Sequence, residues 1–397
     1  MKLLYVANIR LPTEKAHGLQ IVQNCEAFAD ARADVTLWIA QRINAPALRG
    51  VHDIWAHYAV EQNFALRRLP CIDLMPLVPE RTDRLAQLIF LIQLWTFALA
   101  ALVAALFTSA DLIYSRDELI LFLLSFVKPR RMLAYEAHTL APGRGGSALQ
   151  RRVVRRVGHV IAVTRKLADD LIALGADPDR IMVAHDGIRR ARFADLPDKA
   201  AARREIGWSD DAFIVGYVGR LQTMAMDKGV GALVEALAKV GGCSLALVGG
   251  PDDTAEEFRQ RWIELGQDEA RFLYAGQVAP ERVPLYLSAF DVCAMPFPWT
   301  PHFAYYASPI KLFEYMASRR PLIASNLPSI AEVVVDGESA LLIPPADADA
   351  LADAIRRLRD DPALAQRLAD AAYALVMERY TWDARAKAIL AGIQDAG

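Results

Sequence analysis

Short runs of apolar residues alternate with longer segments of helical periodicity along almost the whole chain. The apolar runs, such as "KLLYVAN" near the amino terminus and "CSLALVGG" in the second half, are bounded by turn-forming residues. Such runs are typical of strands buried on both faces, and the periodic segments between them are typical of amphipathic helices. Their regular alternation predicts parallel sheets covered by helices, which is an α/β fold.

The pattern divides into two series of strands and helices. In the first series, strands are expected at "KLLYVAN", "DVTLWIA", "FALRRLP", "DLIYSRD", "RMLAYEA", "HVIAVT" and "RIMVAHDGI", with helices at about 19–31, 82–107, 118–127, 147–157 and 165–174. In the second, strands are expected at "AFIVGYVGR", "CSLALVGG", "RFLYAG", "DVCAMPF", "PLIAS" and "ALLIPP", with helices at about 229–240, 254–266, 280–289, 309–318 and 347–358. The polar segment 187–211 between the two series is typical of an interdomain linker.

The two series predict two successive doubly wound, Rossmann-like domains. We place them at residues 1–190 and 191–380, and we expect a carboxyl-terminal helix at 381–397 to pack back towards the first domain. Two such sheets facing each other would place a cleft at the carboxyl ends of both sets of strands, where open α/β sheets bind ligands. The chemistry is therefore expected in the loops that follow the strands.

Composition fits a globular protein and argues against binding nucleic acid. The 397 residues are 54% hydrophobic and 23% charged, with a formal net charge of −2. The charge is uneven, because residues 1–190 carry 24 basic and 18 acidic side chains whereas the remainder carries 21 and 29. The first half is thus the half that would prefer an anionic surface.

The cysteines and the amino terminus indicate a cytoplasmic protein. Four cysteines lie far apart without metal-ligand spacing, which fits reduced thiols and no structural zinc. The amino-terminal apolar run is too short for the core of a signal peptide, so it is interpreted as a first strand.

Residues 85–109 form an uncharged stretch long enough to span a bilayer. Gln87, Gln93 and Thr96 interrupt it, and a buried strand follows at once. These features favour a crossover helix packed on a sheet. A helix that also touches lipid, or one that crosses a membrane, remains open.

The segment "SPIKLFEYMASRRPLIAS" combines a helix start with two charges in an apolar setting. Ser308 suits the N-cap and Pro309 the first helical position, so the free N–H groups of the first turn could bind a phosphate group beside Lys311. Glu314 falls one turn further on the same face, where it could accept hydrogen bonds from sugar hydroxyls. The alternative is an ordinary i,i+3 ion pair.

The segment "VGRLQTMAMDKG" leaves a strand at Gly219 and Arg220 and reaches Lys228 just before the next helix. Two cations at the carboxyl edge of a sheet could neutralise a departing diphosphate without a metal. Solvated surface charges are the alternative.

Two further positions follow strands in the first half. Gly18 precedes the helix expected at 19 and permits close approach of the backbone, although a lone glycine by itself favours a simple turn. His138 follows a strand, where a neutral imidazole could bind a sugar hydroxyl or the acceptor. An ordinary surface or core histidine is the alternative.

Four arginines form i,i+4 pairs on the helix expected at 147–157. They are Arg151, Arg152, Arg155 and Arg156. Because they lie in the basic half of the chain, they could meet anionic lipid headgroups. A solvated helix face is the alternative.

Two D-x-D sequences, at 177–179 and 347–349, match a pattern by which some sugar transferases bind a divalent cation. The first lies in a turn before a strand, and the second caps a helix. We assign no metal to either.

Taken together, these motifs resemble a known family. "SPIKLFEYMASRRPLIAS" followed by "SIAEVVVDGESALLIPPADADALADAI", with "VGRL" and "DKG" and then "LVGGPDD" upstream, resembles the family 4 (group 1) retaining glycosyltransferases of the GT-B fold. "AHGLQIVQNCEAFA" is similar to the family's glycine loop and first helix. The resemblance covers essentially the whole chain and is strongest from about 213 to 360.

The resemblance implies roles for particular residues. A nucleotide-diphosphate sugar would be held by the second domain, with the diphosphate gripped by Arg220 and Lys228 and the ribose by Glu314. The donor site would also include Gly18, Gly219, Pro309 and the backbone amides of Ser308 and Ile310, while His138 would approach the transferred sugar. One departure is Tyr306, which stands eight residues before Glu314 where the family often has a second glutamate.

The sequence thus predicts a cytoplasmic, metal-independent, retaining glycosyltransferase that needs no cofactor beyond a UDP- or GDP-linked sugar donor. The expected acceptor is a glycan or a lipid-linked precursor of a cell-envelope polysaccharide, reached by peripheral contact with an anionic membrane. The alternatives are a sugar-nucleotide epimerase or phosphorylase on the same fold, or a noncatalytic two-domain solute-binding protein.

Overall fold

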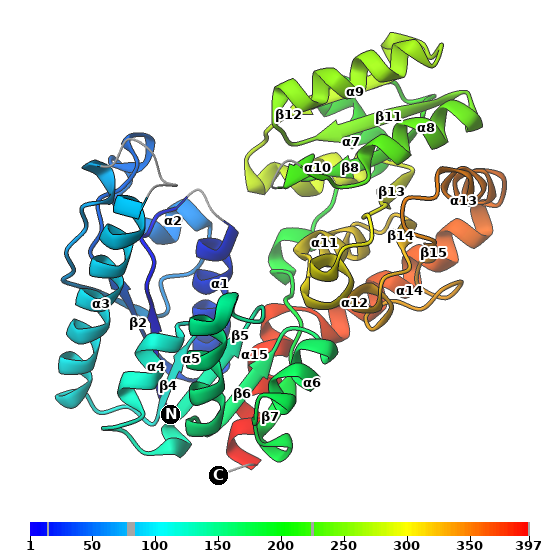
Figure 1. Cartoon of the computed structure of the whole chain (residues 1–397). Helices are drawn as coiled ribbons and strands as arrows, with labels where there is room; N and C mark the ends of the chain where they lie inside the picture. The colour runs from blue at the N-terminus through cyan, green and yellow to red at the C-terminus, as the bar shows by residue number, and fades with distance from the viewer. Residues whose placement is uncertain (14–15, 78–83, 224–225, 396–397) are drawn as a thin grey trace. The chain divides into compact units, whose positions relative to one another are not determined.

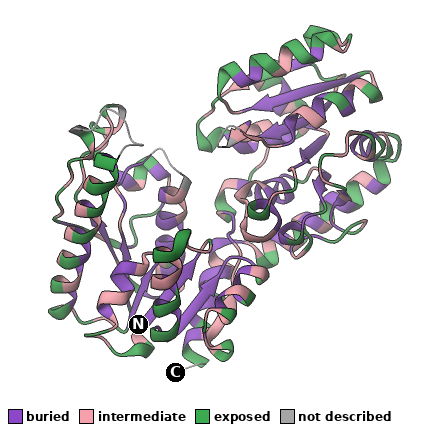
Figure 2. Ribbon diagram, viewed as in Figure 1, coloured by how far each residue is buried: buried purple, intermediate pink, exposed green. Residues whose placement is uncertain are grey.

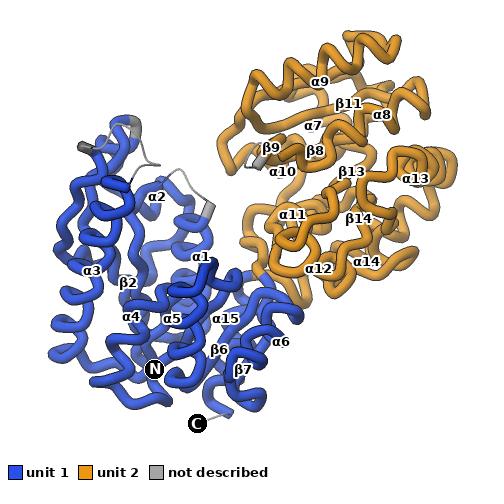
Figure 3. Tube along the Cα trace, in the orientation of Figure 1, with its two compact units in different colours: residues 1–185, 382–397 blue, residues 186–381 orange. Residues whose placement is uncertain are grey.

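The structure, a computed structural model, describes residues 1–13, 16–77, 84–223 and 226–395. The chain forms two compact units, Met1–His185 with Trp382–Gly397 and Asp186–Thr381 (Figure 3). The unit boundaries lie within a few residues of the expected ones, and the last helix belongs to the first unit.

The first unit is built on a seven-stranded parallel sheet (Figure 1). Its strand order is β3-β2-β1-β4-β5-β6-β7, so the chain reverses direction across the sheet between β1 and β4, as in doubly wound folds. The strands are β1 (Lys2–Ala7), β2 (Asp34–Ala40), β3 (Ala65–Leu69), β4 (Leu112–Ser115), β5 (Leu133–Ala137), β6 (His159–Ala162) and β7 (Ile181–Val183).

Helices cover both faces of this sheet. They are α1 (Ala16–Asp30), α2 (Ile54–Tyr58), α3 (Arg84–Leu106), α4 (Glu118–Leu124), α5 (Gly143–Arg156), α6 (Arg165–Ala173) and α15 (Trp382–Asp395). Alternate residues of β1, Leu3, Tyr5 and Ala7, share a core with α1 and α15. Helices α3, α4 and α5 contact one another in sequence along the unit (Figure 1).

The second unit repeats the arrangement with six parallel strands in the order β12-β11-β8-β13-β14-β15. The strands are β8 (Phe213–Val218), β11 (Cys243–Val248), β12 (Phe272–Gly276), β13 (Val292–Met295), β14 (Leu322–Ser325) and β15 (Leu341–Ile343), and a small hairpin joins β9 (Gln222–Thr223) to β10 (Met226–Asp227). The helices are α7 (Lys199–Ile206), α8 (Val230–Val240), α9 (Asp252–Glu264), α10 (Val283–Ala289), α11 (Ile310–Ala317), α12 (Pro328–Ala331), α13 (Ala348–Asp360) and α14 (Pro362–Arg379).

The expected linker at 187–211 is wrong, because it contains helix α7. Asp198 caps the helix by accepting a hydrogen bond from the backbone N–H of Ala201, and Gly207 ends it in a left-handed conformation. Arg203 is buried and pairs with Asp291 at 2.7 Å, so a polar-looking segment is part of the second unit's packed structure.

Helix α3 connects β3 to β4, as expected for a crossover helix, but much of it remains exposed (Figure 2). It is the one described helix long and apolar enough to cross a membrane, and 28% of its most hydrophobic window is buried. It packs against α4 through one side.

Candidate active site

Two glycines bring the loops after β8 and β11 into contact at the carboxyl edge of the second sheet. Gly219 has φ +144° and Gly249 has φ +135°, in a region of backbone conformation that residues other than glycine rarely adopt. A Cβ atom on Gly249 would lie 2.0 Å from the carbonyl oxygen of Gly219. Arg220 follows directly and is exposed at this edge.

Lys228 is held at the same edge by the residues on either side of it. Asp227 caps helix α8 by accepting hydrogen bonds at 2.9 Å from the backbone N–H groups of Val230 and Gly231. Gly229 has φ +88°, and a Cβ atom there would lie 1.7 Å from the carbonyl oxygen of Pro296. The lysine Nζ consequently lies 5.9 Å from the ring centroid of Phe297.

Helix α11 begins one residue later than expected. Pro309 occupies the N-cap position with an extended conformation, and the helix starts at Ile310. Ser308 is not the cap, because its Oγ accepts a hydrogen bond from the backbone N–H of Asp186 at 2.9 Å. The hydroxyl therefore ties the helix start to the beginning of the unit instead of satisfying the first turn.

Lys311 and Glu314 form the i,i+3 ion pair that the sequence left open, with 2.6 Å between Nζ and Oε2. Glu314 is buried, and Arg192 also approaches it at 3.9 Å. The stem of Lys311 packs on the strand end, because a Cβ atom on Gly219 would lie 3.8 Å from Cε of Lys311. An ion pair does not exclude a second role for Glu314, since a carboxylate accepts several hydrogen bonds.

Three cations meet at this edge. Desolvation lowers the pKa of Lys228, and the nearby charges of Arg220 and Lys311 lower it further. Within the described part of the chain, neither Arg220 nor Lys228 has a carboxylate partner, whereas Lys311 is paired with Glu314. The cluster therefore carries excess positive charge that an anion would neutralise.

In the first unit, His138 follows β5 and binds a buried glutamate. Its Nε2 lies 2.7 Å from Oε1 of Glu136, and 29% of its side chain is exposed. Burial alone would raise the pKa of Glu136, but the guanidinium groups of Arg116 and Arg385 hold that pKa well below its ordinary value. Sequence reasoning missed Glu136, because a single glutamate inside a strand gives no sign of its partners on distant segments.

Gly18 does not precede the helix, because α1 already includes it. A Cβ atom there would lie 2.3 Å from Cγ2 of Thr13 and 3.0 Å from the hydroxyl of Tyr58. The glycine thus allows the chain itself to pack closely. Whether a ligand also approaches it stays a prediction.

The four arginines proposed for lipid contact lie on α5 and are all exposed: Arg151, Arg152, Arg155 and Arg156. Two of them also pack against neighbouring residues. Neither the prediction of lipid contact nor the alternative of a solvated helix face included this packing. Arg156 stacks over the ring of Phe126, with 4.4 Å to its centroid, and a Cβ atom on Gly175 would lie 2.4 Å from Nε of Arg155. The four side chains therefore do not act as one uniform basic face, and Arg151 and Arg152 are the pair whose role stays a prediction.

The two D-x-D sequences have the local roles expected of them. Asp177 accepts a hydrogen bond from the backbone N–H of Asp179 in the expected turn, and Asp347 caps α13. Tyr306 ends a short π-helical segment, His302–Tyr306, with its ring 6.3 Å from that of Tyr305.

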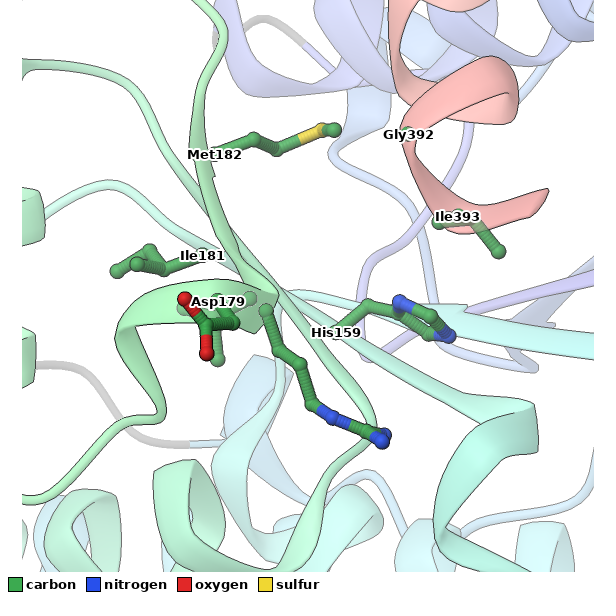
Figure 4. A pocket seen from close by; sticks show the side chains of 8 residues that line it. His159, Asp179, Ile181, Met182, Gly392 and Ile393 are labelled. Atoms are coloured by element: carbon green, nitrogen blue, oxygen red, sulfur yellow. The ribbon is translucent and has the colours of Figure 1, made fainter. Parts of the chain in front are cut away.

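A small cavity in the first unit does not compete with these sites. It has a volume of about 50 Å³ and is lined by residues that include His159, Asp179 and Met182 (Figure 4). These residues lie at the amino ends of β6 and β7, opposite the edge where such sheets bind ligands. A cavity of this size suits a water molecule or two and is too small for a nucleotide sugar.

Comparison with known families agrees with this arrangement. Residues 21–192 match the family model "Glycosyltransferase Family 4", and residues 212–361 match "Glycosyl transferases group 1". Together the two matches span most of the chain. The chain belongs to the family 4, group 1 glycosyltransferases.

Curated relatives of this glycosyltransferase-family chain include two named enzymes. A D-inositol 3-phosphate glycosyltransferase from Acidothermus cellulolyticus is 32% identical over 66% of this chain and 62% of its own length. An alpha-D-kanosaminyltransferase from Streptomyces kanamyceticus is 29% identical over 59% of this chain and 60% of its own length. The chain thus spans about three fifths of the length of these relatives.

Solved structures share the fold over the full chain. HepE from Anabaena, in complex with UDP, has a TM-score of 0.71 at 20% identity, and both chains are covered completely. Sucrose-phosphate synthase from Thermosynechococcus elongatus has a TM-score of 0.77 at 22% identity, over 100% of this chain and 99% of its own. The two Rossmann-like units therefore have the GT-B fold predicted from the sequence.

Proposed function

We propose that this protein transfers a hexosyl group from a nucleotide-diphosphate sugar to a hydroxyl group of an acceptor. The observation that supports it is the cluster of Arg220, Lys228 and Lys311 at the carboxyl edge of the second sheet. Cations fixed there suit a diphosphate leaving group. The family and the names of the relatives point the same way, and HepE has been seen with UDP and glucose together.

In this proposal the second unit holds the donor and stabilises its departure. The bond between the sugar carbon and the phosphate oxygen breaks, and the electron pair passes to the diphosphate between Arg220 and Lys228. Backbone N–H groups at the start of α11 stabilise the same charge. Glu314, already buried beside its two cations, accepts hydrogen bonds from the ribose hydroxyls.

We further propose that the transfer retains the configuration of the sugar and proceeds without a metal. The acceptor hydroxyl attacks from the face that the diphosphate leaves, and its proton passes to a donor phosphate oxygen. No carboxylate base is required for that proton transfer. This route suits a site whose fixed charges are cations.

The experiment is turnover of a nucleotide sugar by Arg220→Ala and Lys228→Ala variants. Each is expected to reduce kcat by roughly 10²-fold or more, because each removes a few kcal/mol of transition-state stabilisation. Lys239→Ala is the matched control, since Lys239 lies on α8 and pairs with exposed Asp349. Near-wild-type turnover in both site variants would refute the role of the cluster.

Binding measurements test which nucleotide the donor carries. Thermal unfolding is measured with UDP, GDP and their sugars, because a ligand at 100 times its Kd stabilises the folded state by roughly 2.7 kcal/mol. We expect one nucleotide diphosphate to stabilise the wild type. The Lys228→Ala variant is expected to lose most of that stabilisation.

We also propose that the acceptor is lipid-linked or lies at a membrane surface, as for a glycan or polysaccharide precursor. The support is the exposed side of α3, which is apolar apart from Arg84 and Gln87 in its first turn. Its exposed large residues are Leu85, Leu88, Phe90, Leu91, Trp95, Leu99, Val103 and Leu106. A surface helix of a protein that stays in water would carry charges on this side.

The surroundings of this apolar stripe favour an anionic bilayer over a second protein. Lys128 donates to the carbonyl of Thr108 at 3.2 Å just beyond the carboxyl end of α3, and Arg156 stacks 4.4 Å from the ring centroid of exposed Phe126. A groove of about 560 Å³ beside the stripe is lined by apolar side chains together with Arg67 and Thr108. Apolar and aromatic side chains flanked by cations suit a headgroup interface.

Flotation with vesicles tests the membrane contact. The wild type is expected to float with phosphatidylcholine vesicles that contain phosphatidylglycerol, and to float less as salt rises. A Leu88→Gln, Leu99→Gln, Val103→Gln triple variant should stay at the bottom of the gradient. The control is Ile263→Gln, Val335→Gln, two exposed apolar positions of the second unit. Absence of flotation at low salt, or a dimer that the triple variant abolishes, would overturn the proposal.

The basic residues of α5 are tested in the same assay. We propose that Arg151 and Arg152 contribute to the attraction, so an Arg151→Gln, Arg152→Gln variant should float less at low salt and depend less on salt. Arg204→Gln, Arg282→Gln is the control, because it removes two exposed arginines from the second unit. An unchanged salt dependence would mean that the charges of α5 are simply solvated.

The alternative functions predict different reaction products. An epimerase would form an epimeric sugar nucleotide without any acceptor, a phosphorylase would consume inorganic phosphate, and a noncatalytic binding protein would release no nucleotide diphosphate. Product analysis by NMR, with and without an acceptor extract, separates these outcomes. We expect nucleotide diphosphate release that depends on the acceptor, and no metal requirement after chelation.

A further inference from the structure

Glu136 is the centre of a buried polar network in the first unit. It lies on β5 at the carboxyl edge of the sheet and is 1% exposed. Its Oε1 faces Nη2 of Arg116 at 2.8 Å, Nη2 of Arg385 at 3.0 Å and Nε2 of His138 at 2.7 Å. Its Oε2 accepts from the hydroxyl of Tyr114 and from the side-chain amide of Asn24.

The network keeps the carboxylate ionised, so its hydrogen-bonding role is fixed. An ionised carboxylate accepts hydrogen bonds and donates none. Nε2 of His138 must therefore carry a hydrogen whether the ring is neutral or charged. With Nε2 carrying the hydrogen, Nδ1 of the neutral ring is a hydrogen-bond acceptor.

We propose that Glu136 is a positioning residue for His138: it holds the imidazole in the Nε2–H tautomer and orients Nδ1 to accept a hydrogen bond from a substrate hydroxyl. This inference rests on the proposed function and on the family resemblance, which implies that His138 approaches the transferred sugar. Arg116 and Arg385 act through Glu136, because they balance its charge. The network also joins α15 to the site, since Arg385 lies on that helix.

Burial makes the arrangement rigid. Arg385 is 3% exposed and donates from Nε to the carbonyl of His185 at 3.0 Å and from Nη1 to Asn24 Oδ1 at 3.2 Å. Arg116 donates from Nη1 to Gln20 Oε1 at 3.3 Å. Each arginine is thus fixed by a further partner, which leaves the carboxylate little freedom to turn away from His138.

The tautomer is measured directly by ¹⁵N NMR of the full chain labelled at its histidine rings. The chain has seven histidines, and the His138 signals are those missing from a His138→Asn spectrum. We expect Nε2 of His138 to show the chemical shift of a nitrogen that carries hydrogen, and Nδ1 to show that of a hydrogen-bond acceptor in the neutral ring. The reverse pattern, with Nδ1 protonated in the neutral ring, would overturn the inference without bearing on whether the protein is a transferase.

Turnover of two matched variants gives the second readout. Asparagine places amide atoms at the position of Nδ1, whereas glutamine places them at the position of Nε2. We expect His138→Asn to keep about tenfold more of the wild-type kcat than His138→Gln, which is the effect of about one hydrogen bond. Equal loss in both, or greater loss in His138→Asn, would contradict the use of Nδ1.

Glu136→Gln tests the positioning itself. Glutamine can donate or accept, so the ring should populate both tautomers in the NMR spectrum and kcat should fall. If this variant does not fold because two buried arginines lose their partner, the wild-type spectrum still decides. A folded Glu136→Gln protein with an unchanged Nε2–H spectrum and unchanged kcat would refute the proposal.

Discussion

At the scale of single residues, Gly229 links backbone conformation to the placement of a charge. The residue has φ +88°, and because it lacks a side chain its backbone can pack directly against the carbonyl group of Pro296. Lys228 precedes it, so the direction of the lysine depends on this passage. A glycine next to a lysine looks like an ordinary turn in the sequence, and the contact with Pro296 appears only in the folded unit.

We predict that Gly229→Ala impairs turnover about as strongly as Lys228→Ala, roughly 10²-fold. The added Cβ would lie 1.7 Å from the Pro296 carbonyl oxygen, so the loop must move and carry Lys228 with it. Gly207→Ala is the control, because Gly207 also has positive φ, +75°, but has open space around its Cβ position. That control should lose about 1 kcal/mol of stability and keep its turnover.

His185 makes the stability of the first unit depend on pH. Desolvation lowers the pKa of His185 to about 4, and the charges of Arg385 and Arg165 add to that effect. The unfolded chain binds the proton near pH 6.5, so stability is present above that pH and is lost as pH falls towards 4. The loss is on the order of 3 kcal/mol.

We therefore predict that the free energies of unfolding of the wild type and of His185→Asn approach each other as the pH falls. Urea unfolding at intervals from pH 7.5 to pH 4 should show the wild type losing stability faster than the variant below pH 6.5. Differences between the two proteins isolate His185 from other acid-sensitive groups such as Glu136. Parallel curves would mean that the His185 ring is equally protonated in folded and unfolded chains.

At the scale of elements, strands and long helices were predictable and the functional helix starts were not. The apolar runs marked the position of the strands of the two main sheets, because burial on both faces leaves a continuous pattern in most of them, although edge strand β3 is largely exposed. The start of α11 was missed by one residue because Ser308 binds a distant backbone N–H, which no local rule anticipates. The network around Glu136 was missed for the same reason.

Helix α7 is the clearest case of a tertiary contact overriding composition. Its sequence is polar, yet Arg203 is 1% exposed and donates to the carbonyls of Ala289, Asp210 and Ala212 as well as to Asp291. The arginine thus satisfies several acceptors at once. A solvent-exposed linker would have no need of it.

We predict that Arg203→Met destabilises the second unit by about 3–5 kcal/mol, because three carbonyls would lose their Arg203 donor and Asp291 would lose its buried cationic partner, keeping Lys199 and the backbone N–H of Ile214. Arg204→Met changes the exposed neighbour and should have an effect within about 0.5 kcal/mol. Urea unfolding followed by tryptophan fluorescence measures both, since Trp208 stacks on Phe290 beside α7. If Arg203→Met lowered the free energy of unfolding by less than 1 kcal/mol, the Arg203–Asp291 ion pair would contribute little to stability.

At the scale of the whole molecule, the chain leaves the first unit and returns to it. The second unit is continuous and has a core of its own, whereas the core of the first unit includes Trp382, Ala386 and Ile389 from the last helix. The return point is close to the exit point, because Arg385 Nε lies 3.0 Å from the carbonyl oxygen of His185. The first unit is therefore complete only with both segments.

This organisation predicts different behaviour for three fragments. Residues 186–381 should fold alone, and residues 1–185 alone should not, because loss of α15 removes core side chains and one of the two arginines that balance Glu136. That loss is on the order of 5 kcal/mol or more, comparable to the whole stability of a typical domain. Joining 1–185 to 382–397 through a short Gly-Ser linker should restore a cooperative thermal transition, as measured by circular dichroism. The decisive comparison is between the two forms of the first unit: if 1–185 melts as cooperatively and at the same temperature without the helix, α15 is an accessory to that unit and Glu136 keeps its charge through Arg116 alone.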